Sequence, residues 1–219
     1  MALKNTRSQT EILESCRIAL QNVETNPTIK PLMEALGYNT AKIDAGKALL
    51  SSAKTLYIQN QELEDTKLKA YQSFEEKRVE IDLKYAKDRK KAKIIFKTDP
   101  IILKELGLKG SLPRTYVKWV ETVTLFYNTL TKQPAILSQL AALQITETYV
   151  TEMLAALEGL EVLRADYIQT KGNAQNATKT KNKAFAVLDK WMSAFYGIAR
   201  IALEDEPQLL ESLGKTVKS

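Results

Sequence analysis

Apolar side chains recur at steps of three and four residues between Ser8 and Thr25. This spacing places them on one face of a helix. The same pattern returns in the second half of the chain, in the segment from Pro113 to Thr131, where most of the side chains are larger. The sequence therefore predicts two helices that each bury one face. The apolar positions are Ile12, Leu13, Cys16, Ala19, Leu20 and Val23 in the first helix, and Val120, Val123, Phe126, Tyr127 and Leu130 in the second.

Two much longer segments, residues 39–97 and 146–204, contain no proline and no strand-like alternation. In the first of them, Leu56, Leu63 and Ala70 step by seven residues. This spacing is typical of a helix that pairs along its length with another helix. We therefore expect two very long helices.

The second long segment contains a polar stretch, residues 169–182, that leaves two interpretations open. Gly172 and Asn173 fit a hairpin turn at this point. The alanines of the same stretch keep helical spacing and fit a continuous helix. We expect the continuous helix, because the first long segment has no helix breaker at the equivalent place, residues 65–69.

A short motif that begins with a polar residue followed by proline occurs four times. Proline tolerates the first turn of a helix and presets its backbone, so each motif predicts a helix start. Three of the four end in Leu-Gly, where glycine can adopt the left-handed conformation that ends a helix. Each motif therefore predicts a short corner helix. The motifs are NPTIKPLMEALG, DPIILKELG, QPAILSQLAAL and EPQLLESLG.

The repeated order of these segments predicts a duplicated architecture. One constant, gapless shift of the sequence along itself places Pro27 on Pro134 and also Pro100 on Pro207, and we call this shift the repeat offset. We expect an all-α protein built from two tandem helical units, residues 1–110 and 111–219. Each unit would contain a short helix, a corner helix, a very long helix and a second corner helix, and together they would form an elongated helical bundle.

The stretch from Phe195 to Gly214, FYGIARIALEDEPQLLESLG, resembles the end of a set of uncharacterised bacterial all-helical proteins that close on a P-Q-L-L-E-x-L-G motif. The preceding stretch from Gln175 to Met192, QNATKTKNKAFAVLDKWM, adds to the likeness. The resemblance implies a helical fold and brings no activity with it.

The composition favours some cellular locations and some kinds of partner over others. The first ten residues lack the apolar core of a signal peptide, and no stretch approaches the 18 apolar residues of a membrane-spanning helix. Cys16 is the only cysteine, which fits a reducing cytoplasm. The formal charge of +6 favours acidic partners only mildly.

Histidine is missing from the sequence, and this removes many kinds of site. Histidine-ligated zinc, Glu-x-x-His di-iron centres and catalytic triads that need histidine are all excluded. Neither common phosphate-binding loop motif occurs. We therefore expect no metal, no cofactor and no enzyme activity, although a carboxylate- or lysine-based activity leaves no motif and stays open.

A basic stretch, residues 84–97, leaves three interpretations open. It could be a solvated or helix-pairing face, a nucleic-acid surface or a surface for an anionic membrane. Single-strand binders place several aromatic residues among the basic ones, and this stretch holds only Tyr85 and Phe96. We favour the solvated or pairing face. The candidate anion-facing residues are Lys84, Lys87, Arg89, Lys90, Lys91, Lys93 and Lys97.

The equivalent stretch of the second half, residues 191–203, is aromatic and apolar instead. Such a run is either core or an intermolecular surface, because aromatic residues and methionine are enriched in interfaces. If it lacks a partner in its own chain, it would contact the stripe on residues 8–25 of the next copy. The candidate self-association residues are Leu13, Cys16, Leu20, Val23, Trp191, Met192, Phe195 and Tyr196.

Contacts of this kind join unlike surfaces and give rings or filaments. The sequence therefore predicts a non-enzymatic, self-associating helical scaffold or filament-forming protein, with itself as the partner. Two alternatives stay open. One is a peripheral membrane-binding or pore-forming helical protein that does not span the bilayer as a helix. The other is a nucleic-acid-associated protein that uses residues 84–97.

Overall fold

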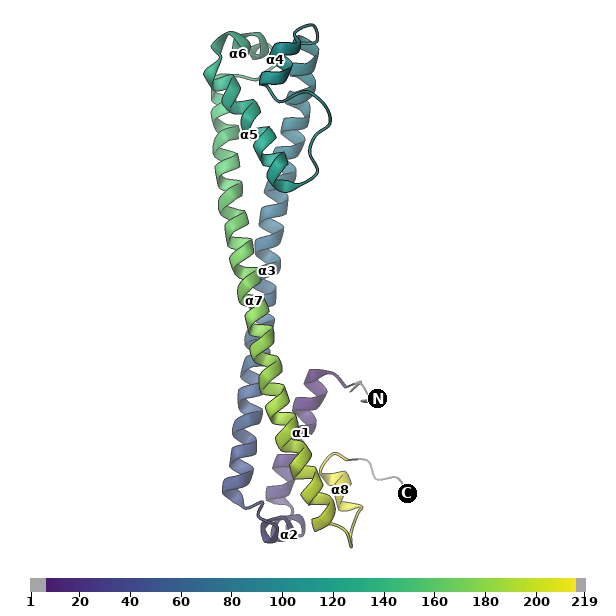
Figure 1. Cartoon of the computed structure of the whole chain (residues 1–219). Coiled ribbons are helices and arrows are strands. Elements are labelled where there is room, and N and C mark those ends of the chain that lie inside the picture. Colours follow the sequence, from purple (N-terminus) through teal and green to yellow (C-terminus); the bar gives the residue numbers. More distant parts are fainter. Residues whose placement is uncertain (1–6, 216–219) are drawn as a thin grey trace. The chain divides into compact units, whose positions relative to one another are not determined.

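The computed structural model describes residues 7–215, and all of their regular secondary structure is α-helical (Figure 1). This confirms the all-α prediction. Within residues 7–215, none of the helices is both long and apolar enough to cross a membrane. The helices are α1 (Gln9–Thr25), α2 (Ile29–Ala35), α3 (Thr40–Ile95), α4 (Pro100–Glu105), α5 (Tyr116–Lys132), α6 (Pro134–Ala141), α7 (Glu147–Ala202) and α8 (Leu209–Ser212).

The chain folds into two compact units, each with its own hydrophobic core. Within the described residues, the first unit combines residues 7–65 with residues 172–215, and the second unit is residues 66–171. Both long helices contribute a part to each unit. The boundary between compact units therefore differs from the boundary at residue 110 between the predicted sequence repeats.

The core of the first unit joins α1, α2 and the first half of α3 to the second half of α7 (Figure 1). The apolar stripe of α1 is buried against aromatic residues of α7. Ring contacts extend this core, since Tyr38 lies edge-on to both Trp191 and Phe195, with centroids 5.8 and 5.6 Å away. A polar pair also lies in this unit: the amide of the buried Asn60 donates to the hydroxyl of the half-buried Thr178 over 3.0 Å.

The core of the second unit joins the second half of α3, α4, α5, α6 and the first half of α7 (Figure 1). Its largest fully buried side chains are aromatic, with Tyr85, Phe126 and Tyr127 in edge-to-face contact. The predicted apolar face of residues 113–131 is therefore confirmed as the buried face of α5.

The second long segment is one continuous helix, α7, and the hairpin alternative is wrong. Ala174 of the polar stretch is completely buried, so the helical spacing of its alanines serves packing. Gly172 has no atom close to where a side chain would lie, and no turn forms there. The sequence-based preference for a continuous helix is confirmed.

The four predicted corner motifs end with the same backbone geometry. After α2, α4, α6 and α8, one residue has a positive φ, and the next N–H reaches back to a carbonyl five residues earlier. This is the Schellman ending of a helix. Three of these residues are the expected glycines, whereas the fourth is Gln144, with a φ of 66°. The glycines are Gly37, Gly107 and Gly214.

The repeat offset also relates the helix boundaries. The shift that places Pro27 on Pro134 places both ends of α1 on the ends of α5, and both ends of α3 on the ends of α7. The contact between Asn60 and Thr178 in the first unit corresponds under this offset to the ring contact between Tyr167 and Tyr71 in the second. The superposition of two copies of one structure stays a prediction.

Candidate functional site

The candidate self-association residues lie in the core of their own chain. Leu13, Cys16, Leu20 and Val23 of α1 and Met192, Phe195 and Tyr196 of α7 are all buried in the first unit, and Trp191 packs against the same core. The expectation that residues 191–203 lack a partner within the chain is therefore wrong. The physical reason is that α1 of the first half covers α7 of the second half.

The basic stretch on α3 does not form one uniform face in the second unit. Lys84 forms an ion pair with Glu80 over 2.7 Å, and the half-buried Lys91 lies 3.4 Å from Asp88. Arg89 turns inward and donates to the carbonyl oxygens of Leu108 and Gly110. Of the other four candidates, Lys87 and Lys90 on α3 and Lys97 just after it are exposed, and Lys93 is half-buried.

A buried polar cluster lies beneath this stretch. The Asp88 carboxylate is almost fully buried and accepts hydrogen bonds from the hydroxyls of Tyr127 and Tyr149, over 2.8 and 2.7 Å. Burial raises the pKa of both phenols, and after it the charge of Asp88 acts on Tyr127 and the hydrogen bond to Asp88 acts on Tyr149 in the same direction. The cluster holds its protons firmly and joins α3, α5 and α7, so we assign it a structural role.

A groove in the second unit combines aromatic rings with arginines, and we call it the arginine–aromatic groove. It has a volume of about 700 Å³ and is bounded by α3, the segment before α5, the start of α5 and α7. Its rings are those of Tyr71, Phe74, Tyr116, Trp119 and Tyr167, its cations are Arg78, Arg114 and Arg164, and its carboxylates are Glu75 and Asp82.

The rings of the groove support one another. Phe74 is stacked on Tyr167 with centroids 6.2 Å apart, and Tyr116 lies 5.5 Å from Phe74. The Arg164 guanidinium lies 4.0 Å from the centre of the Tyr116 ring, where a cation is attracted by the ring face. These contacts hold the groove wall in one arrangement.

Most polar groups of the groove already have partners. Trp119 donates to Asp82 over 2.7 Å, and Arg78 forms an ion pair with Glu75 that lowers the pKa of that carboxyl group. Arg114 is exposed at the rim. Glu161 lies beside the groove and accepts from the Tyr116 hydroxyl over 2.7 Å. The exposed Arg114 at the rim is therefore the cation of the groove that best suits a negatively charged group next to apolar or aromatic ones.

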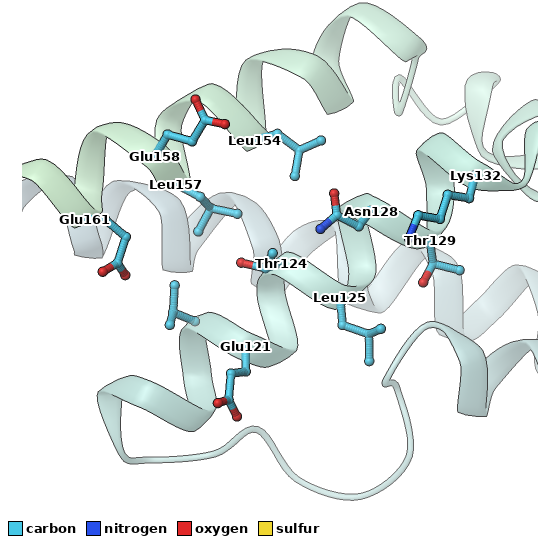
Figure 2. Close-up of a pocket in the computed structure, with 11 residues that line it drawn as sticks. Glu121, Thr124, Leu125, Asn128, Thr129, Lys132, Leu154, Leu157, Glu158 and Glu161 are labelled. Atoms are coloured by element: carbon cyan, nitrogen blue, oxygen red, sulfur yellow. The ribbon is translucent and has the colours of Figure 1, made fainter.

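A second groove of the same unit, about 640 Å³, lies between α5 and α7 (Figure 2). Its apolar floor is rimmed by the carboxylates of Glu121, Glu158 and Glu161, and Lys132 lies at the far end of α5. The carboxylates are exposed and spread along two helices. In the described part of the chain, no three cysteine, aspartate or glutamate side chains are grouped as a metal site.

The arginine–aromatic groove could not be recognised from the sequence. Its residues come from segments that are far apart in the chain, since Tyr71 and Tyr167 face each other across α3 and α7. The closest signal in the sequence is the repeat offset, which aligns the polar pair Asn60 and Thr178 with these two tyrosines. This alignment indicates a contact between the two tyrosines only when it is known that α3 pairs with α7.

Comparisons of the chain with protein-family models, with curated proteins and with solved structures found no match. The resemblance of residues 195–214 to bacterial helical proteins thus stays a prediction.

Proposed function

We propose that this protein is a non-enzymatic helical scaffold that associates with copies of itself through the arginine–aromatic groove. The observation that carries the proposal is the composition of the groove, in which tyrosines and a tryptophan lie beside arginines. Tyrosine, tryptophan and arginine are the residues that most often dominate the binding energy of protein interfaces. An open groove with this lining supports a role in protein–protein contact.

The partner surface that we propose is an acidic turn of the first unit, residues 204–206 of another copy. Glu204, Asp205 and Glu206 begin two residues after the end of α7 and are exposed. Among residues 7–215, their carboxylates have no ion-pair partner. The exposed Ile201 lies one turn earlier and adds an apolar side chain.

Charge supports this choice of partner. The chain carries a formal charge of +6, so copies repel one another unless opposite charges meet locally. An acidic turn that meets the exposed Arg114 at the rim of the groove supplies such a contact. Because the two surfaces differ, an open chain of copies has a free groove at one end and a free turn at the other. Such a chain either grows into a filament or closes into a ring when its two ends meet.

Light scattering of the purified full chain over a range of concentrations tests the proposal. Wild type is expected to grow in mass with concentration. Arg114→Glu alone and Asp205→Arg alone should each stay monomeric, since each places like charges in the contact. An equal mixture of the two variants should regain association, because the reversed groove fits the reversed turn.

Two exposed sites provide matched controls. Lys118→Glu and Glu34→Arg make the same changes of charge outside the groove and the turn, and they should associate as wild type does. Circular dichroism confirms that each variant is folded. A wild type that stays monomeric at every concentration overturns the proposal, and so does a mixture of the reversed variants that fails to associate.

A further inference from the structure

A pocket in the first unit gathers positive charge from three separate segments. Arg7 lies just before α1, Arg200 lies in the last turn of α7, and Lys215 follows α8. The pocket has a volume of about 310 Å³, and Asp189 is the only carboxylate among the residues of 7–215 that line it. We call it the basic pocket.

The backbone holds Lys215 in place within this pocket. Its N–H donates to the carbonyl of Leu210 over 3.1 Å, which is the closing bond of the helix end after α8. Its ammonium group lies 4.1 Å from the centre of the Tyr196 ring. The Tyr196 hydroxyl in turn donates to the carbonyl of Leu213 over 3.1 Å, so ring and helix end are joined.

The cations of the basic pocket are not balanced within it. Burial lowers the pKa of Lys215, and the positive charges of Arg7 and Arg200 lower it further. Cys16 and Asp189 act in the opposite direction and have smaller effects. In the described part of the chain, three cations therefore line the pocket with one carboxylate, and an anion among them would relieve the repulsion.

A lysine is also unusual at position 215, which follows the positive-φ residue of a Schellman helix ending. The residue that closes a Schellman ending is commonly apolar and packs against its helix. At the other three endings it is Tyr38, Leu108 or Ile145, and all three are buried. A lysine at the fourth gives up this packing, and such departures from a local rule are expected at functional positions.

We propose that the basic pocket binds a phosphate group, either as inorganic phosphate or as the head of a phosphate ester. A tetrahedral oxyanion presents oxygens in several directions and can accept from donors that converge from α7 and from both chain segments beside it. The exposed Ser193 hydroxyl also lines the pocket and adds a neutral donor. This site lies outside the groove and does not depend on the proposed self-association.

Isothermal titration calorimetry of the full chain with sodium phosphate, at constant ionic strength, tests the proposal. Wild type is expected to bind one phosphate per chain. Arg200→Ala and Lys215→Ala should each weaken binding by about tenfold or more, whereas Lys190→Ala should leave it unchanged. Lys190 is an exposed lysine of α7 that does not line the pocket, so it controls for the loss of one charge.

Vesicles separate the two sources of the phosphate group. Binding to phosphatidic acid vesicles but not to phosphatidylcholine vesicles, with the same loss in Arg200→Ala, supports the site and assigns it to a lipid head. Binding of inorganic phosphate without vesicle binding supports a free ligand. The proposal is overturned if neither binds, if acetate binds as tightly as phosphate, or if both alanine variants bind as wild type. Thermal melting with and without phosphate shows whether each variant is folded, and only wild type and Lys190→Ala should gain stability from phosphate.

Discussion

The indole ring of Trp191 on α7 lies against the backbone of Gly46 on α3, so closely that a Cβ atom at Gly46 would overlap the ring. The ring is stacked on Phe195, with centroids 5.6 Å apart, and is met edge-on by Tyr38. Under the repeat offset, Met153 and Lys84 occupy the corresponding positions of the second unit. The large ring therefore requires the small residue, and the two belong to one intramolecular contact.

Replacing Gly46 by alanine should destabilise the first unit. Alanine normally stabilises the interior of a helix over glycine by about 1 kcal/mol. At Gly46 this gain is offset by displacement of a ring that is held by two aromatic neighbours, and overpacking costs about 1–3 kcal/mol. We expect a net loss in the free energy of unfolding, measured by urea denaturation.

Gly159 provides the matched control. It also lies inside a long helix, but no atom lies within 4 Å of where its Cβ would be. Gly159→Ala should therefore stabilise the protein by about 0.5–1 kcal/mol. In a Trp191→Leu background, Gly46→Ala should lose its penalty. An equal stabilisation by both alanines in the wild-type background would show that the ring yields freely.

The helices and corners could be predicted because their signals are local. Steps of three and four residues identify α1 and α5, and proline followed by Leu-Gly identifies the corner helices. The pairing of the two halves could not be predicted in this way. The stripe around Cys16 is equally suited to α7 of its own chain or of another copy, and periodicity does not distinguish them.

The charged residues of 84–97 are a second case in which the local sequence pattern does not predict the tertiary contacts. Asp88 and Arg89 lie in a stretch that is rich in lysine, and a solvated face is the natural interpretation. In the structure both turn inward, since Asp88 meets two tyrosine hydroxyls and Arg89 meets two carbonyl oxygens. The rotation of α3 about its own axis relative to α5 decides which of these side chains face inward. That rotation depends on tertiary packing and is not encoded in the local sequence pattern.

Gln144 ends α6 with a positive φ, a conformation that is costly for residues with a side chain. We expect Gln144→Gly to stabilise the protein by roughly 0.5–1 kcal/mol, after the larger entropy of glycine in the unfolded chain is included. Gln144 is exposed, so the change removes no core packing. Thermal melting measures the gain.

Gly37 provides the reverse experiment, because it has the same role after α2 with a φ of 87° and no atom within 4 Å of a Cβ. Gly37→Gln should destabilise by a similar amount. If the two substitutions shift the melting midpoint in the same direction, backbone conformation does not control these helix ends.

Replacing Asp88 by leucine should destabilise the second unit by about 2–5 kcal/mol. The change leaves the hydroxyls of Tyr127 and Tyr149 buried without their acceptor, and each unsatisfied group costs about 1–3 kcal/mol. In the triple variant Asp88→Leu, Tyr127→Phe and Tyr149→Phe, all members of the cluster are apolar, and most of the loss should be recovered. Urea denaturation of wild type, Asp88→Leu, the double variant Tyr127→Phe with Tyr149→Phe, and the triple variant completes the cycle. Additive losses in the triple variant would contradict a hydrogen-bonded cluster.

Tyr196 should make the protein less stable in base. Burial raises the pKa of its phenol to about 12, the nearby Cys16 acts in the same direction, and Arg7 acts against them. In the unfolded chain the phenol has the ordinary tyrosine pKa of about 10. Between these two values the unfolded state loses the proton while the folded state keeps it, so the free energy of unfolding falls as the pH rises. Below about pH 10 the contribution of Tyr196 is fully present.

Tyr196→Phe isolates this contribution from the other tyrosines. Near neutral pH the variant should be less stable than wild type by about 1 kcal/mol, because the carbonyl of Leu213 loses its donor. From about pH 10 to about pH 12 the difference should shrink, since only wild type still has this phenol to titrate. Urea denaturation at a series of pH values measures the difference, and ultraviolet absorbance of tyrosinate follows the titration directly. A difference that stays constant through this range would mean that the Tyr196 phenol titrates alike in the folded and unfolded chains.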